Sequence, residues 1–156
     1  MFLIALSGGK IADRERITDG LVGGGKARLV GYALNPPAVR VEGARKLPPL
    51  DGPARSKRLV QAIEGLECQP PVAGGLVIVH CLTPEEAAVV RESGGEVWHV
   101  YGPNPSALVP IRRADRMVAP EGAGFAHVLT PLEALSEYLL ALGLSARDRP
   151  RGGARG

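Results

Sequence analysis

The residues best placed for chemistry follow the first apolar run of the chain, Phe2–Leu6. They are Ser7, Gly8, Gly9 and Lys10. Where a strand turns on glycines into a helix, backbone N–H groups point inward and the helix N-terminus favours an anion. This pattern makes the four residues a candidate phosphate-binding loop. The same turn is common in α/β proteins of every function, so a purely structural turn is the alternative.

A second glycine-rich stretch, Gly20–Ala27, satisfies the spacing G-x-x-x-x-G-K. Alanine stands where a serine or threonine hydroxyl would bind Mg²⁺. The stretch also precedes a predicted strand, whereas a P-loop follows a strand and opens a helix. We therefore interpret it as a flexible connection.

Two further groups are candidates on the substrate side. His80 ends the most apolar run of the chain, and α/β sheets place their sites at the carboxyl ends of strands. A structural histidine is the alternative. Arg112, Arg113 and Arg116 form a charged cluster with Asp115, for which a solvated turn is the alternative. No histidines, cysteines or carboxylates show metal-ligand spacing, so we expect no structural metal.

The elements that position these residues alternate between short apolar runs and amphipathic segments, which is typical of an α/β domain. We expect strands at 2–6, 28–34, 75–80, 96–101 and 116–118, and helices at 12–22, 55–66, 84–92 and from 131 onward. Thr83 and Thr130 each begin a Thr-Pro-x-Glu capping sequence, and Gly94 fits a left-handed helix end. Proline and charge in Val39–Pro53 indicate a long loop, and the role of Pro36–Pro53 stays open.

Composition narrows the class of protein. The chain has 156 residues, of which 45% are apolar, enough for one domain with a core. Its net charge of +3 comes from the end of the chain, because the last ten residues hold four arginines and one aspartate. We expect a domain at 1–144 and a basic, mobile tail at 145–156. Without the tail the domain is near neutral, unlike a duplex-DNA binder. We therefore expect at most weak nucleic-acid contact, through the tail.

Cysteine usage and apolar runs indicate the compartment. Two cysteines are too few for a disulfide framework, so a reducing cytoplasm is the simplest location. No stretch approaches the ~20 apolar residues of a membrane span, and we expect no membrane partner.

The stretch Gly75–Gly102, GLVIVHCLTPEEAAVVRESGGEVWHVYG, is similar to the second half of the phage deoxynucleoside monophosphate kinases. Glu86, Arg91, Gly94-Gly95 and Glu96–Val100 match that pattern without a gap. The opening LSGGKIADRERITDGLV also resembles the family's strand, glycine loop and helix. About half the chain is covered. The resemblance implies a three-layer α/β fold of the P-loop nucleotide kinase type, with a mainly parallel sheet of about five strands. It also implies ATP and Mg²⁺ as cofactors if the protein is active.

The departures from that family concern its phosphoryl-transfer residues. Arg14 stands where the essential lysine would be, between the acidic Asp13 and Glu15. His80 replaces an aspartate, and Leu82 replaces an arginine that would hold a monophosphate. Phosphate cradle, metal support and substrate clamp are thus all degenerate.

Two functional hypotheses follow. The first is a degenerate nucleotide kinase-like protein with a degenerate Walker A loop, which binds a nucleotide while phosphoryl transfer is doubtful. Its phosphate-side candidates are Ser7–Lys10 and Arg14, and its substrate-side candidates are His80, Arg112 and Arg113. The alternative is a non-catalytic, phage-type interaction protein that binds a host protein in the host cytoplasm. Converging N–H groups in the first loop favour the first hypothesis. A loop closed by Ile11, or by an ion pair between Asp13 and Arg16, favours the second.

Overall fold

A computed structural model describes residues 2–24, 28–34, 51–67, 74–103, 105–106, 108–121 and 127–148. Six strands are described: β1 (Phe2–Ser7), β2 (Leu29–Tyr32), β3 (Gly75–Ile78), β4 (Glu96–Val100), β5 (Arg116–Val118) and β6 (Val128–Leu129). The described helices are α1 (Ile11–Gly23), α2 (Gly52–Glu67), α3 (Pro84–Glu92) and α4 (Pro131–Asp148). The predicted α/β class is therefore confirmed.

The strands form one parallel sheet in the order β2-β3-β1-β4-β5-β6. Its central strands β1, β3 and β4 are almost entirely buried, because helices cover both faces of a parallel sheet. The prediction of about five strands misses β6, whose two residues are too few for a recognisable pattern.

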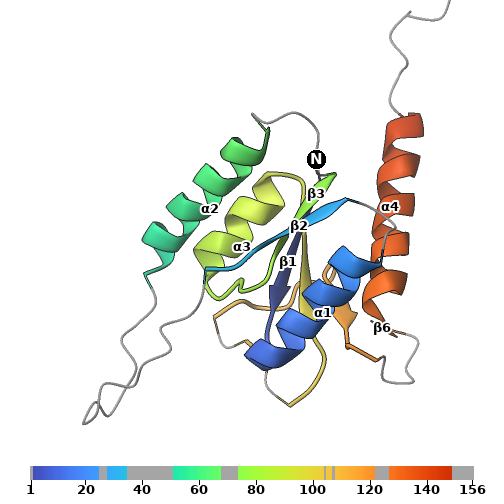
Figure 1. Cartoon of the computed structure of the whole chain (residues 1–156), viewed down its shortest axis with the longest axis horizontal. Coiled ribbons are helices and arrows are strands. Elements are labelled where there is room, and N and C mark those ends of the chain that lie inside the picture. Colours follow the sequence, from blue (N-terminus) through green and yellow to red (C-terminus); the bar gives the residue numbers. More distant parts are fainter. Residues whose placement is uncertain are drawn as a thin grey trace, which may run out of the picture.

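The helices make the outer two of three layers, with α2 and α3 on one face and α1 and α4 on the other (Figure 1). Ile17, Leu21, Leu135 and Tyr138 pack with Trp98 on the α1 and α4 face. On the opposite face, helices α2 and α3 bury a second cluster that includes Leu59, Ile63, Ala87, Val90 and Ile78. These helix residues recur at the spacing of a helical apolar face.

The predicted helix starts are confirmed at two helices. The Thr83 hydroxyl accepts the backbone N–H of Glu86 at 3.4 Å, and the Thr130 hydroxyl accepts that of Glu133 at 3.3 Å. Gly94 has φ +82°, the left-handed conformation expected after α3. Each of these signals is short in sequence, which is why it could be recognised without the fold.

Two boundary predictions were wrong. Pro53 lies in the first turn of α2 rather than in a loop, and Asp51 accepts the N–H of Ala54 at 3.0 Å ahead of it. The first part of the predicted connection at Gly20 belongs to α1, which runs to Gly23 because Leu21 anchors it in the core. Residues 25–27 of that connection, and 36–50 of the predicted loop, lie outside the described residues.

At the other end of the chain, α4 continues to Asp148, past the predicted boundary at residue 144. Positions 149–156 of the predicted tail lie outside the described residues. Of the helices in the described part of the chain, none has the length and apolar character needed to span a membrane.

The strand order places a topological switch point between β1 and β3. Strand β1 leads into α1 on one face of the sheet, and its neighbour β3 leads into α3 on the opposite face (Figure 1). Open α/β sheets bind ligands in the crevice that such divergent connections leave at the carboxyl ends of the strands. The loop after β1 and the residues after β3 both lie at this point.

Candidate functional site

The loop after β1 depends on its two glycines. Gly8 has φ +76° and Gly9 has φ +66°, values that side-chain-bearing residues rarely adopt. A Cβ atom on Gly9 would also lie 2.6 Å from Cγ1 of Val100 on β4. The turn is therefore both left-handed and pressed against the neighbouring strand, which the glycine pair permits.

Arg14 fills the inside of this loop. Its side chain is buried, and its Nη1 donates to the carbonyl oxygens of Gly8 at 2.8 Å and Gly9 at 3.1 Å. Its Nε donates to Nδ1 of His80 at 3.1 Å. Burial lowers the pKa of the Arg14 guanidinium, although an arginine in a protein keeps its charge. Loop carbonyls, rather than loop N–H groups, thus face this buried cation.

Neither of the two loop-closing contacts that would favour the interaction hypothesis is formed. Ile11 is 45% exposed, and Arg16 makes its ion pair with Glu121 at 2.6 Å instead of with Asp13. Asp13 accepts the backbone N–H of Lys10 at 3.3 Å. The loop is held by Arg14 from within.

His80 lies at the carboxyl end of β3 and is 1% exposed. Burial, followed by the charges of Arg14 and Arg55, lowers the pKa of His80 to about 4. The ring is therefore neutral at neutral pH, and since Nδ1 accepts from Arg14, the proton is on Nε2.

Two buried polar atoms at this edge have no hydrogen-bond partner among the described residues. They are Nε2 of His80 and Oγ of Ser7, the last residue of β1. Beside them, Arg14 uses its Nε and Nη1 in its bonds to described residues, and its Nη2 is not one of these buried unpartnered atoms. An unpartnered buried polar group costs about 1–3 kcal/mol, so an acceptor that reached these donors would be stabilised.

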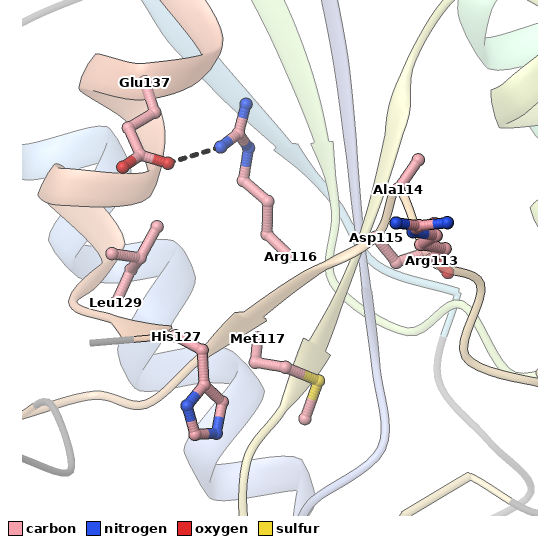
Figure 2. A pocket seen from close by; sticks show the side chains of 8 residues that line it. All are labelled: Arg113, Ala114, Asp115, Arg116, Met117, His127, Leu129 and Glu137. Atoms are coloured by element: carbon pink, nitrogen blue, oxygen red, sulfur yellow. Dashed lines mark hydrogen bonds and ion pairs between the residues drawn. The ribbon is translucent and has the colours of Figure 1, made fainter. Parts of the chain in front are cut away.

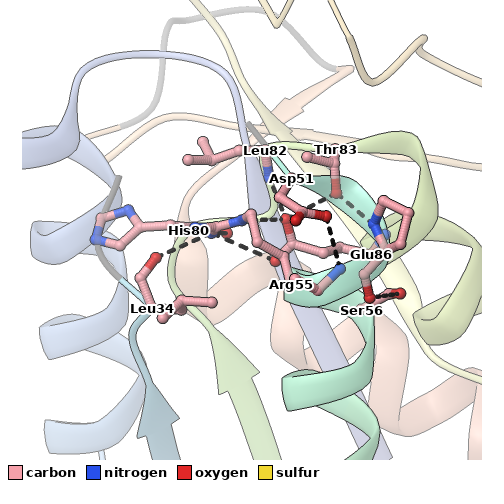
Figure 3. Close-up of polar contacts among 10 residues, drawn as sticks. Leu34, Asp51, Arg55, Ser56, His80, Leu82, Thr83 and Glu86 are labelled. Atoms are coloured by element: carbon pink, nitrogen blue, oxygen red, sulfur yellow. Dashed lines mark hydrogen bonds and ion pairs between the residues drawn. The ribbon is translucent and has the colours of Figure 1, made fainter. Parts of the chain in front are cut away.

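A buried ion pair supports the site from the other side of His80. Arg55, at the start of α2, donates to Glu86 on α3 with Nε at 2.7 Å, and both side chains are almost fully buried. Its Nη2 donates to the carbonyl oxygens of Leu34 at 2.9 Å and His80 at 3.1 Å. Figure 3 shows Arg55 between the ends of β2 and β3, with the His80 ring pointing away from it. The Thr83 hydroxyl completes the cluster at 2.9 Å from Glu86 Oε1.

The predicted site residues are thus only partly brought together. Ser7–Lys10, Arg14 and His80 meet at the switch point, with Lys10 exposed at the start of α1. Arg112 and Arg113 line cavities beside the first residues of β4 and β5, at the amino end of these strands. They therefore do not face the same space as His80.

Sequence reasoning missed the role of Arg55 and gave Glu86 no role beyond capping. A signal was present, since Arg55 precedes Leu59 and Ile63 at four-residue spacing on the apolar face of its helix. Arg14 likewise lies on the apolar face of α1, three residues before Ile17 and seven before Leu21. A charged residue on an otherwise apolar helical face indicates a buried, paired charge.

The described residues at the switch point do not fit Mg²⁺. Two guanidinium groups contact His80: that of Arg14 donates to the ring, and that of Arg55 donates to the backbone carbonyl oxygen. Both are cationic donors, whereas Mg²⁺ binds oxygen ligands such as carboxylates. In the described part of the chain, no cluster of three or more His, Cys, Asp or Glu side chains could hold a metal ion.

Comparisons of the chain with protein-family models, with curated proteins and with solved structures find no match. Fold and site together therefore define the class: a three-layer parallel α/β protein whose candidate site lies at the switch point between β1 and β3.

Proposed function

We propose that this protein binds a nucleotide through its phosphate group at the switch point, and that it is a kinase-like scaffold without phosphoryl transfer. The observation that carries the proposal is the pair of unpartnered buried groups at that point, the Ser7 hydroxyl and Nε2–H of His80, with the charged Arg14 guanidinium bonded to the same His80 ring. His80 and Arg14 can only donate there, and a phosphate group consists of acceptors.

Neighbouring groups add to the attraction for an anion. Helix α1 begins directly after the glycine loop, so its N-terminal dipole favours negative charge there. The exposed Lys10 ammonium stands at the same helix end. The likeness of the chain to the phage deoxynucleoside monophosphate kinases makes a nucleoside phosphate the natural ligand to test.

Binding is favoured over catalysis because Arg14 is already engaged. Three of its N–H groups are taken by Gly8, Gly9 and His80, and Asp13 sits next to it in the first turn of α1. A guanidinium held in this way stabilises the loop and cannot follow a phosphoryl group through its transfer.

A second candidate is a protein-interaction role without nucleotide binding. It is favoured by three apolar side chains that are about half exposed, namely those of Ile11, Leu108 and Ile111. Such a role would leave the buried donors at the switch point unused.

The test is thermal unfolding of the full chain with ATP, dATP and the deoxynucleoside monophosphates, each with and without Mg²⁺. A ligand at a hundred times its Kd adds about 2.7 kcal/mol, which is several degrees for a domain of this size. A shift that requires Mg²⁺ would favour the active kinase instead. Unchanged unfolding with every nucleotide would overturn the proposal and favour the interaction role.

Ser7→Ala is the diagnostic variant. The Ser7 hydroxyl has no described partner, so its removal should leave the unfolding temperature of the free protein unchanged or raise it. The nucleotide-induced shift should nevertheless become smaller, and Lys10→Ala should reduce it as well. Ser93→Ala, which changes an exposed serine after α3, is the matched control and should leave the shift intact.

A further inference from the structure

Arg112 and Arg113 are the predicted site residues that the switch point does not include, and they lie on a rigid turn. Asp115 accepts the backbone N–H of Arg112 at 2.9 Å and returns its own N–H to the Arg112 carbonyl oxygen at 3.0 Å. The same carboxylate accepts from Arg91 on α3 at 2.7 Å and contacts Nε2 of His99 on β4 at 2.8 Å. The turn is thereby fixed to two elements of the core.

The two arginine side chains on this turn are uncompensated. Both are exposed, and neither guanidinium makes an ion pair or hydrogen bond with a described residue. The nearby arginines, in contrast, are paired. Arg91 forms an ion pair with Asp115, and Arg116 forms ion pairs with Glu96 and Glu137. Two adjacent like charges on a fixed backbone repel each other, and a bound anion would relieve that repulsion.

A cavity lies on each side of the turn. Arg112 lines one of about 230 Å³ with Arg91 and Glu96, and Arg113 lines one of about 350 Å³ with Arg116 and His127. Figure 2 shows the second cavity, with Arg116 turned toward Glu137 on α4 and Arg113 next to Asp115. Both volumes are several times the roughly 30 Å³ of a water molecule, so each admits a phosphate group.

We propose that the Arg112–Asp115 turn is a second binding site, for a ligand with at least two neighbouring phosphate groups. Arginine matches phosphate because its planar fork donates two parallel hydrogen bonds. Each cavity pairs a free arginine with one whose charge is already balanced, and the turn sets the two cavities side by side. Because the turn is fixed before binding, little ordering is needed when a ligand arrives.

The lining of the two cavities holds arginines and three carboxylates, each already paired with Arg91 or Arg116, which leaves Arg112 and Arg113 to contact phosphates. No Phe, Tyr or Trp side chain is among the described residues that line the two cavities, so nothing there stacks on a nucleobase. A free oligophosphate and a nucleic-acid backbone share this chemistry. The site does not depend on the proposed nucleotide site, since the two lie at opposite ends of the strands.

The test uses the full chain with two probes at low ionic strength. Inorganic tripolyphosphate is titrated calorimetrically, and a fluorescent single-stranded oligothymidylate is titrated by anisotropy. The double variant Arg112→Ala/Arg113→Ala should bind the recognised probe about tenfold more weakly. Loss with tripolyphosphate alone identifies a free oligophosphate, and loss with both probes identifies a phosphodiester backbone as well.

The control removes the same net charge elsewhere. Arg28→Ala/Arg58→Ala changes two exposed arginines, one directly before β2 and one on α2. This variant should bind both probes with affinities within about twofold of those of the unmodified protein. Equal binding by the two double variants, for both probes, would overturn the proposal. Repeating the titrations in Ser7→Ala separates the sites, because the arginine-dependent loss must persist there even if nucleotide binding fails.

Discussion

Acidification should destabilise this protein through His80. The imidazole is 1% exposed, and its pKa is lowered from 6.5 to about 4 by burial and by the charges of Arg14 and Arg55. At a pH between these two pKa values, His80 is protonated in the unfolded chain and neutral in the folded chain. The unfolded state is therefore favoured as the pH falls, and the stability present above pH 6.5 is lost on the way down to about pH 4.

The magnitude follows from the interval. Each pH unit between the two pKa values contributes about 1.4 kcal/mol, so the whole interval amounts to about 3 kcal/mol. That is a large fraction of the 5–15 kcal/mol or so by which a domain is stable. Protonation at Nδ1 would also remove the acceptor for Nε of Arg14, the residue whose Nη1 holds the glycine loop from within.

The assay is urea unfolding of the full chain and of His80→Gln at several pH values. The Gln amide oxygen can accept from Arg14 but takes up no proton. The free energy of unfolding of the unmodified protein minus that of His80→Gln should therefore fall by about 3 kcal/mol on acidification. His127→Gln, which removes an exposed histidine, is the control. A difference that stays constant with pH, or that grows on acidification, would refute the reasoning.

Two further predictions concern buried groups beside the site. Arg55→Met leaves the fully buried Glu86 carboxylate without its counter-charge, so urea unfolding should show a loss of about 3–5 kcal/mol in the free energy of unfolding. The double variant Arg55→Met/Glu86→Leu should restore part of that loss. An Arg55→Met protein as stable as the unmodified one would contradict the role of the ion pair. Burial raises the pKa of the Cys81 thiol to about 12. In a Cys68→Ser variant, Cys81 should therefore resist iodoacetamide until the chain is unfolded. Rapid labelling of the folded protein would disprove the burial of Cys81.

The sequence alone determined the class of fold, because its signals are local. Thr83 and Glu86 are three residues apart, and so are Thr130 and Glu133, so a helix start can be recognised without knowing what surrounds it. The sequences of β1 and β3 are almost continuously apolar because both faces of the sheet are covered. The glycine loop could be placed for the same reason. The resemblance to the phage kinases stays a prediction.

Only the tertiary structure decided which charged residues meet. Arg14 and His80 are 66 residues apart, and they touch because β3 pairs with β1. That pairing turns a residue with the sequence position of a phosphate ligand into the internal support of its own loop. Arg112 and Arg113, with charges as suitable as that of Arg14, are carried to the other end of the sheet by the connection between β4 and β5. Strand order is set by the burial of whole faces, which no short stretch of sequence records.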